Sequence, residues 1–410
     1  MTLERPDSPK FDLSQLLSGF GGIYLVNAVI AFIFAASAPI AIILTAGEKG
    51  GLAEADLASW IFGSFFINGL ISIAFCLYYR QPLVFFWTIP GTVLVGQGLE
   101  HLSFAETIGA YYATGLLMLV LGLTGWMRKC MSLLPMPIVM AMVAGVFLQF
   151  GLNLIFAIRD GFLIAAPMTA AFLLLWAVPR FGRVLPPLIG ALIVGIAAIF
   201  LFGTFDLGSA AAFSFARPNL YVPEFSWNAM VELVIPLAIT VLAAQNAQGY
   251  AVLEAAGHKP PVNAVTAACG LGSMIAALVG TVSTCLTGPV NAIISSAGEK
   301  DRHYAAGVLV ALFALVFGLF SPVFTRFMLA TPAAFIAALA GLALVRILER
   351  AFVTSFSGSF TLGAVVTFLV TVADVPILSI GAPFWGLVVG FAVSWALERD
   401  DFRNLTAERA

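Results

Sequence analysis

Long apolar runs separated by short polar stretches dominate the chain. Runs of about 18 or more apolar residues, the length that crosses a bilayer as a helix, recur from Phe20 to Trp395. With the polar stretches taken as their boundaries, these runs predict fourteen membrane-spanning segments in two sets of seven. The first set covers residues 20–45, 57–79, 83–100, 104–125, 134–154, 162–179 and 184–203, and the second covers residues 228–252, 261–280, 282–298, 304–325, 330–349, 357–373 and 377–397.

The third and tenth segments are interrupted at matching places. Residues 83–98 and 283–298 each run through a β-prone stretch into a Thr-x-Pro break and continue as a short apolar stretch containing glycine. The two prolines, Pro90 and Pro289, are 199 positions apart. Each is predicted to lie in the first turn of a half-helix, where its missing N–H costs nothing. Paired broken segments in the two halves of a membrane protein indicate the binding site of a transporter.

The repeat extends beyond the broken segments. Further matches at offsets of 195 or 196 join Leu134–Pro137 and Gly145 to Leu329–Pro332 and Gly341, and Pro187–Gly190 to Pro383–Gly386. Because seven is an odd number of spans, the second unit must be inverted in the membrane. The alternative is that proline and glycine simply punctuate helices throughout. The predicted fold is an all-α polytopic membrane protein with 14 transmembrane segments as a 7+7 inverted repeat, in which segments 3 and 10 are each a short strand plus a half-helix.

Composition supports this class and excludes others. The chain is 61% hydrophobic and 10% charged, with a net charge of −2, and no basic patch exists to bind nucleic acid. The first 18 residues have no signal-peptide pattern, so the first apolar run is interpreted as a retained helix. Cys76, Cys130, Cys269 and Cys285 lack metal-ligand spacing and are interpreted as small core residues.

Loop charges predict the orientation. With the N-terminus inside, the cytoplasmic stretches hold fifteen Lys and Arg residues, against four on the opposite side: Lys49, Arg159, Arg217 and Arg326. This positive-inside bias predicts that both termini are cytoplasmic. The expected location is the bacterial inner membrane.

The two half-helices should form the site. Irregular backbone at membrane depth needs protein or a water-filled cavity around it, and two helix N-termini that converge near the midplane suit an anion. The side-chain candidates share this predicted neighbourhood. They are Gln245, Asn246 and Gln248 in the eighth segment, Gly91 and Thr92 in the first half-helix, Val290 and Asn291 in the second, Ser37 in the first segment, and Phe85, Phe86 and Trp87 as an apolar wall.

Each candidate also has a simpler interpretation. The amides and hydroxyls could form helix–helix hydrogen bonds, and the aromatic residues could be packing or interface anchors. Tyr24, Phe34 and Tyr250 are weaker candidates for the apolar wall.

Titratable groups give no obvious proton carrier. Glu232 is predicted toward the outer interface, Asp374 in an outer turn and Glu254 near an inner helix end, each as a solvated cap. His101, His258 and His303 are predicted to titrate in water within loops. No cofactor or metal is expected.

Three motifs carry a resemblance to a known family. Gln245-Asn246-Ala247-Gln248-Gly249, Gly288-Pro289-Val290-Asn291 and the stretch from Thr331-Pro332 to Ala343 resemble the BenE family of bacterial benzoate/proton symporters, over nearly the whole length. That family is similar in organisation to nucleobase permeases and SLC26-type anion transporters. Nucleobase permeases typically carry glutamates where this chain has Gln245 and the Val290-Asn291 neighbourhood, which argues against a nucleobase ligand.

The resemblance implies a mobile core that slides against a gate or scaffold. The implied parts are a cytoplasmic tail (1–18), the core in two halves (19–126 and 206–326), the gate in two halves (127–205 and 327–398) and a second cytoplasmic tail (399–410).

The leading functional prediction is a secondary transporter of an aromatic carboxylate, namely benzoate, which is taken up with protons by alternating access. The expected partners are benzoate, protons and membrane lipid, and the resemblance suggests a homodimer. The nearest alternative is a transporter of another organic or inorganic anion. An intramembrane enzyme is a remote alternative, because such enzymes need clustered His, Asp or Glu residues that the spans lack. A channel is equally remote.

Overall fold

Helices build almost all of the described structure. The computed structural model describes residues 3–6, 13–18, 20–36, 38–127, 135–178, 185–202, 213–296, 298–375, 377 and 382–407. In the first half the elements are α1 (Leu13–Ser18), α2 (Gly22–Ala36), α3 (Ala38–Lys49), α4 (Glu54–Phe62), the π-helix η1 (Gly63–Ile67), α5 (Asn68–Tyr79), β1 (Phe85–Trp87), α6 (Ile89–Gly98), α7 (Phe104–Thr124), α9 (Met136–Asp160), α10 (Phe162–Ala177) and α12 (Pro187–Phe202).

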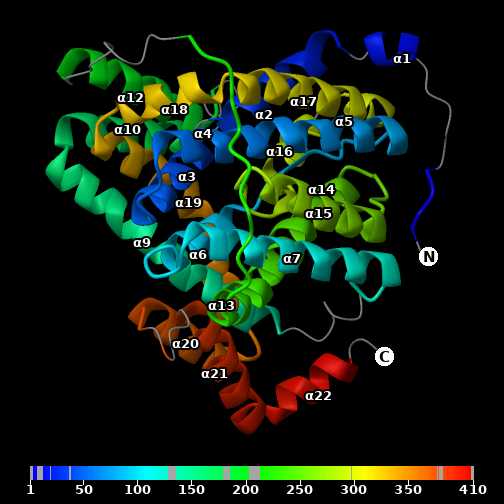
Figure 1. Cartoon of the computed structure of the whole chain (residues 1–410), viewed down its shortest axis with the longest axis vertical. Helices are drawn as coiled ribbons and strands as arrows, with labels where there is room; N and C mark the ends of the chain where they lie inside the picture. Colours follow the sequence, from blue (N-terminus) through cyan, green and yellow to red (C-terminus); the bar gives the residue numbers. More distant parts are fainter. Residues whose placement is uncertain are drawn as a thin grey trace.

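The second half has the same kinds of element. They are α13 (Trp227–Ile239), the π-helix η2 (Thr240–Asn246), α14 (Ala247–Ala255), α15 (Val262–Ala277), β2 (Thr284–Leu286), α16 (Gly288–Ile294), the 3-10 helix η3 (Lys300–Arg302), α17 (His303–Leu319), α18 (Ser321–Leu329), α19 (Ala333–Phe356), α20 (Thr361–Ala373), α21 (Ala382–Leu397) and α22 (Arg399–Ala407). In Figure 1, α17, α5, α15 and α7 lie one below another, and α20, α21 and α22 form the lower end of the molecule.

Length and hydropathy identify the protein as a polytopic membrane protein. In the described part of the chain, six continuous helical stretches are long and apolar enough to cross a membrane, or seven if a pair bent by 110° is counted as one span. The other predicted segments coincide with shorter apolar helices or with a strand followed by a helix. The count of fourteen spans and the inverted repeat therefore remain predictions.

Several boundaries differ from the sequence-based ranges; α9 runs on to Asp160 and α19 to Phe356, beyond the predicted ends at 154 and 349. The predicted segment 304–325 is wrong at its end, because α17 stops at Leu319 and a separate helix, α18, begins at Ser321 with Pro322 in its first turn. Proline cannot continue the hydrogen-bond ladder of a preceding helix, so the chain restarts there. The first segment, 20–45, extends to Lys49 as two helices, α2 and α3.

The broken segments follow their prediction. β1 and α6, and likewise β2 and α16, form a three-residue strand followed by a helix with proline in its first turn. The two strands pair antiparallel, with Phe86 opposite Cys285. Elements that are 199 positions apart in the sequence therefore meet at one place in the fold.

The buried apolar residues fall into separate groups. The largest cluster draws its members from residues 16–127 and 229–317. A second draws its buried members from residues 154–199 and 335–342. A third joins the two regions, because Ile42 and Val93 of the first pack with Val146 and Phe147 of α9 and Leu344 of α19. Cys76, Cys269 and Cys285 are buried free thiols, as predicted, whereas Cys130 lies outside the described residues.

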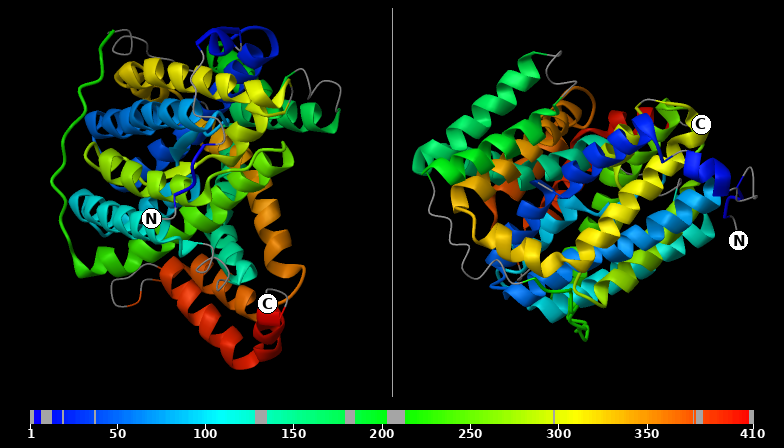
Figure 2. Two further views of the ribbon diagram at one scale, coloured as in Figure 1. Left: turned by 90° about the vertical axis from the view of Figure 1, so that its right-hand side faces the viewer. Right: turned by 90° about the horizontal axis from the view of Figure 1, so that it is seen from above.

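An extended segment, residues 213–226, runs across the surface from the α12 side of the molecule to α13 (Figures 1 and 2). Its backbone N–H groups bond helices that are distant in sequence: Ala216 donates to Leu319, Tyr221 to Leu278 and Glu224 to Ala105. The phenol of Tyr221 also donates to the carboxylate of Asp56 on α4. This segment ties α4, α7, α15 and α17 together at one end.

Glycine allows α7 and α15 to approach closely. A Cβ on Gly270 would lie 2.4 Å from the backbone nitrogen of Leu119, and one on Gly122 would lie 2.4 Å from that of Ala267. These neighbours are backbone atoms, which cannot rotate away.

We expect Gly270→Ala to lower the melting temperature and the yield of monodisperse protein in detergent, because overpacking of this kind costs about 1–3 kcal/mol. The matched control is Gly358→Ala, since a Cβ there has no neighbour within 4 Å. Equal stability of the two variants would contradict the close packing of α7 on α15.

Candidate substrate site

The paired strands β1 and β2, which we call the strand crossing, lead directly into the two half-helices α6 and α16. At the start of α6, the hydroxyl of Thr88 accepts a hydrogen bond from the backbone N–H of Gly91 at 3.2 Å. At the start of α16, the corresponding Thr287 makes no such capping bond. The two helix starts are therefore alike in sequence but differ in how their first N–H groups are satisfied.

A small pocket lies where these two helix starts meet. It is lined by Phe34, Ala35, Pro39, Phe86, Trp87, Ile89, Gln245, Thr287, Pro289 and Val290. Its volume is about 20 Å³, which is room for roughly one water molecule. Its walls are mainly aromatic and aliphatic, with one amide and one hydroxyl among them.

Gln245 is the amide of this pocket. It lies near the end of η2, a π-helical turn between α13 and α14, and 6% of it is exposed. Within the described residues its side chain has no hydrogen-bond partner in the protein. Single π-helical turns within a longer helix are frequent at functional sites. The amide is thus available to a ligand.

Asn246 and Asn291 instead hold the strands. The side-chain oxygen of Asn246 accepts from the backbone N–H of Leu286 at 2.7 Å. The Asn291 amide binds both polar groups of Val84, accepting from its N–H at 3.0 Å and donating to its carbonyl at 3.2 Å. Both side chains are buried. The structure supports the alternative interpretation of these two residues, as internal hydrogen-bond partners.

Two serines complete the support in equivalent positions. The hydroxyl of Ser72 on α5 accepts from the N–H of Phe85 at 2.8 Å, and that of Ser273 on α15 accepts from the N–H of Thr284 at 2.9 Å. Phe85 and Thr284 are 199 positions apart, as the two prolines are. The strands are therefore supported in the same way on both sides.

The structure gathers only some of the predicted site residues. Gln245, Phe86 and Val290 line the pocket, together with Trp87 and Phe34. Phe85 packs its ring edge-on against Phe75, away from this pocket. Thr92 is buried and its hydroxyl donates to the carbonyl of Thr88.

The other candidates are not among the lining residues. Gly91, Asn246 and Asn291 do not line the pocket, and Gln248 packs beside Gly288. Ser37 lies outside the described residues. Sequence reasoning missed five lining residues: Ala35, Pro39, Ile89, Thr287 and Pro289. The Thr-x-Pro pattern was the signal that could have identified Thr287 and Pro289.

Two histidines are not in water, contrary to the sequence prediction. His258 and His303 are buried, with Nε2 of His258 3.1 Å from Nδ1 of His303. Burial, and after it the neighbouring His303, lower the pKa of His258 to about 4. The prediction failed because hydropathy places a residue in a loop but does not show that the start of α17 covers that loop.

Glu232 is also buried, contrary to its interpretation as a solvated cap. Only 5% of it is exposed, and its carboxylate lies 2.9 Å from Nε2 of His101, which follows α6. The loop after α6 folds over α13 and shields this carboxylate. Glu254, by contrast, is exposed as predicted.

Comparison with known proteins identifies the family. Residues 22–396 match the family described as "BenE: Benzoate membrane transport protein". The chain belongs to the BenE family. The matched range includes the strand crossing, both half-helices and all the residues that line the pocket.

BenE relatives are similar over almost their full length. The chain is 30% identical to the inner membrane protein YdcO of Escherichia coli (strain K12) over 371 residues, which cover 89% of this chain and 93% of the relative. It is 28% identical to the benzoate membrane transport protein of Acinetobacter baylyi, over 97% of this chain and 98% of that protein. This BenE chain is therefore a membrane transporter and not an enzyme.

Solved structures share the fold of this BenE chain. The transmembrane domain of the cyanobacterial bicarbonate transporter BicA matches with a TM-score of 0.59 at 17% identity, covering 90% of this chain and 97% of that domain. SLC26A9 matches with a TM-score of 0.61 at 16% identity, covering 91% of this chain and 65% of that one. At this identity the likeness concerns the fold alone.

We expect Asn246→Ala and Asn291→Ala to destabilise the protein, since each leaves a buried backbone N–H in or beside a strand unpaired, at a cost of about 1–3 kcal/mol. Thermal unfolding in detergent measures this effect. Gln245→Ala is the matched control, because its amide satisfies no described group. A melting temperature equally low for all three variants would contradict the division between strand support and pocket lining.

Proposed function

We propose that the chain takes up benzoate, or a closely related aromatic carboxylate, together with a proton across the bacterial inner membrane. The observation that carries this proposal is the pocket at the strand crossing, where aromatic walls meet the unpartnered amide of Gln245 in a member of the BenE family. The Acinetobacter relative is described as a benzoate membrane transport protein.

The pocket chemistry favours a flat ring with one polar end. Phe34, Phe86 and Trp87 offer apolar surface to a ring, and Gln245 and Thr287 offer hydrogen-bond donors to a carboxylate. No Lys or Arg is among the lining residues. An anion would enter this environment at a high cost unless a proton accompanied it.

The small volume of the pocket requires motion. About 20 Å³ cannot hold an aromatic acid, so the pocket must open to bind one. We propose that a core (19–126 and 206–326) moves against a gate (127–205 and 327–398), within an inverted repeat of fourteen spans whose termini are both cytoplasmic. The separate apolar clusters support this division, because all buried members of the largest cluster except Leu16 and Met127 lie within the proposed core, and the second lies largely within the proposed gate.

A second candidate substrate is a small inorganic anion. BicA is a bicarbonate transporter and Slc26a9 is described as an anion transporter, and both share this fold. The mainly apolar lining of the pocket favours the aromatic acid over such an anion.

Uptake of labelled benzoate into proteoliposomes tests the proposal. A proton gradient, acidic outside, should increase the initial rate, and unlabelled benzoate should compete where bicarbonate and chloride do not. Competition by bicarbonate with no benzoate uptake would favour the second candidate. Absence of any gradient effect would contradict proton coupling.

We expect Gln245→Ala to weaken benzoate binding roughly 10- to 150-fold, since losing a donor to a charged ligand costs about 1.5–3 kcal/mol. Gln245→Glu should bind less well still at neutral pH, and its defect should ease in acid as the new carboxyl group is protonated. Calorimetric titration measures both. The matched control is Gln81→Ala, which removes an amide that bonds the carbonyl of Lys259 outside the pocket. Unchanged affinity in Gln245→Glu would place the carboxylate elsewhere.

We expect a covalent link between core and gate to stop transport. Thr45 on α3 and Asn153 on α9 line one cavity from the two proposed parts, so Thr45→Cys with Asn153→Cys can be joined by a short reducible reagent. Uptake should fall to the background level and return after reduction. The two single-cysteine variants, treated alike, are the controls. Full uptake in the cross-linked protein would rule out this relative motion.

A further inference from the structure

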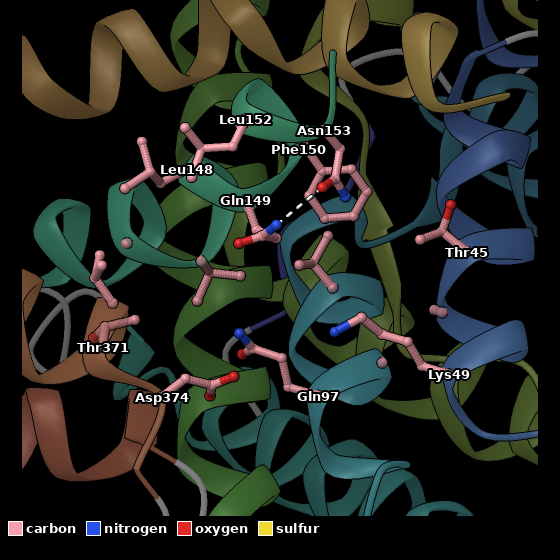
Figure 3. Close-up of a pocket in the computed structure, with 16 residues that line it drawn as sticks. Thr45, Lys49, Gln97, Leu148, Gln149, Phe150, Leu152, Asn153, Thr371 and Asp374 are labelled. Atoms are coloured by element: carbon pink, nitrogen blue, oxygen red, sulfur yellow. Dashed lines mark hydrogen bonds between the residues drawn. The ribbon is translucent and has the colours of Figure 1, made fainter. Parts of the chain in front are cut away.

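A second cavity, larger and more polar, lies between the proposed core and gate. Its volume is about 250 Å³, and its walls come from α3, α6, α9, α20 and the turn after α20. Its polar lining residues are Thr45, Lys49, Gln97, Gln149, Asn153 and Asp374. In Figure 3 the ends of Lys49, Gln97 and Asp374 point toward one another, while Gln149 donates to Asn153 at 2.9 Å.

The same two helices connect this cavity to the pocket at the strand crossing. On α6, Ile89 lines the small pocket, and Val93 and Gln97 line the polar cavity; spacings of four and eight place all three on one helix face. On α3, Pro39 lines the small pocket and Ala46 the polar cavity. The small pocket and the polar cavity therefore lie one after the other along α3 and α6.

A layer of packed apolar side chains separates the small pocket from the polar cavity. Ile42 and Val93 contact a cluster that includes Val146 and Phe147 of α9 and Leu344 of α19. This layer joins the proposed core to the proposed gate, so relative movement of the two parts would open it. In the orientation proposed above, the polar cavity is on the outer side of the layer.

The charges in the cavity are one cation and one carboxylate, with three more groups close by. Lys49 Nζ bonds the carboxylate of Glu100 at 2.6 Å. Asp374 is an exposed residue, as predicted. Its partial burial raises the pKa of its carboxyl group, and Glu100 raises it further, while Lys49 and His101 oppose the change. His101 is in turn paired with Glu232. The residues that α9 contributes to the cavity are all uncharged.

Gln97 lacks a partner for part of its amide. Its side-chain oxygen is buried and accepts no hydrogen bond within the described residues. In Figure 3 its amide lies between Lys49 and the carboxyl group of Asp374. A ligand with both a donor and an acceptor would satisfy this part of the wall.

We propose that the polar cavity is an entry site that binds the substrate carboxylate together with a proton carried by Asp374. The inference rests on the proposed function, benzoate uptake, and adds the site at which the proton joins the substrate. No covalent bond changes: Asp374 takes a proton from water, and its carboxyl O–H donates to the substrate carboxylate, which Lys49 attracts from the opposite wall.

The pairing explains how an anion reaches an apolar pocket. Asp374 and benzoate together carry two negative charges when both are ionised, and one proton removes one of them. The ring has apolar surface available on Val93, Val146 and Phe150. When the layer opens, the proton can pass to the benzoate carboxylate, so that benzoate crosses the apolar layer without a net charge.

Protection of a cysteine in the cavity gives a local readout of this site. In Thr45→Cys protein, benzoate should slow modification by a charged thiol reagent less and less as the pH is raised, since affinity falls about tenfold per pH unit above the pKa of Asp374. Adding Asp374→Asn should make the protection independent of pH, because the amide keeps a donor and carries no charge. Lys49→Gln should weaken protection roughly tenfold.

The matched control is Asp160→Asn in the same Thr45→Cys background, because Asp160 is an exposed carboxylate that does not line the cavity. Its protection should follow pH as in the parent. If Asp374→Asn keeps the pH dependence, or if benzoate is transported but never protects Thr45→Cys, the entry site is wrong while the proposed function stands. If the parent neither binds nor transports benzoate, the proposed function itself fails.

Discussion

The pairing of two three-residue strands is the constraint on which the rest of the structure depends. Backbone that leaves a helix at membrane depth must have every N–H and C=O satisfied by protein. Here each strand satisfies part of the other, and Ser72, Ser273, Asn246 and Asn291 satisfy much of the remainder. Because these side chains come from α5, α15, the η2–α14 junction and α16, the strand pair fixes the positions of all those helices around it.

This arrangement explains why amides cluster in an apolar chain. Gln245 and Asn246 are neighbours in the sequence but have different roles. The side-chain oxygen of Asn246 accepts a hydrogen bond from the Leu286 N–H, whereas Gln245 lines the pocket. The π-helical turn that ends at Asn246 sets the direction of both side chains. The protein needs the first amide to fold and can use the second to bind.

The sequence could predict the helices, the two strand-plus-helix breaks and the neighbourhood of the site, because hydropathy and proline spacing are local signals. It could not predict which amides line the pocket, since periodicity does not reveal a π-helical turn or a partner 207 positions away such as Val84 for Asn291. The burial of His258, His303 and Glu232 escaped prediction for the same reason. Each is covered by a segment remote in sequence, and no pattern around the residue itself carries that information.

The extended segment 213–226 has a consequence for how force passes through the molecule. Its main-chain N–H groups bond to α7, α15 and α17, and the N–H of Asn219 donates to the hydroxyl of Ser59 on α4. The side chains of Asn219 and Tyr221 also donate to Asp56 on α4. A segment that is bonded to several helices resists their sliding past one another. If one helix moved relative to the others, its hydrogen bonds to the segment would break. It therefore couples the four helices mechanically, so that a force on one of them is transmitted to the other three.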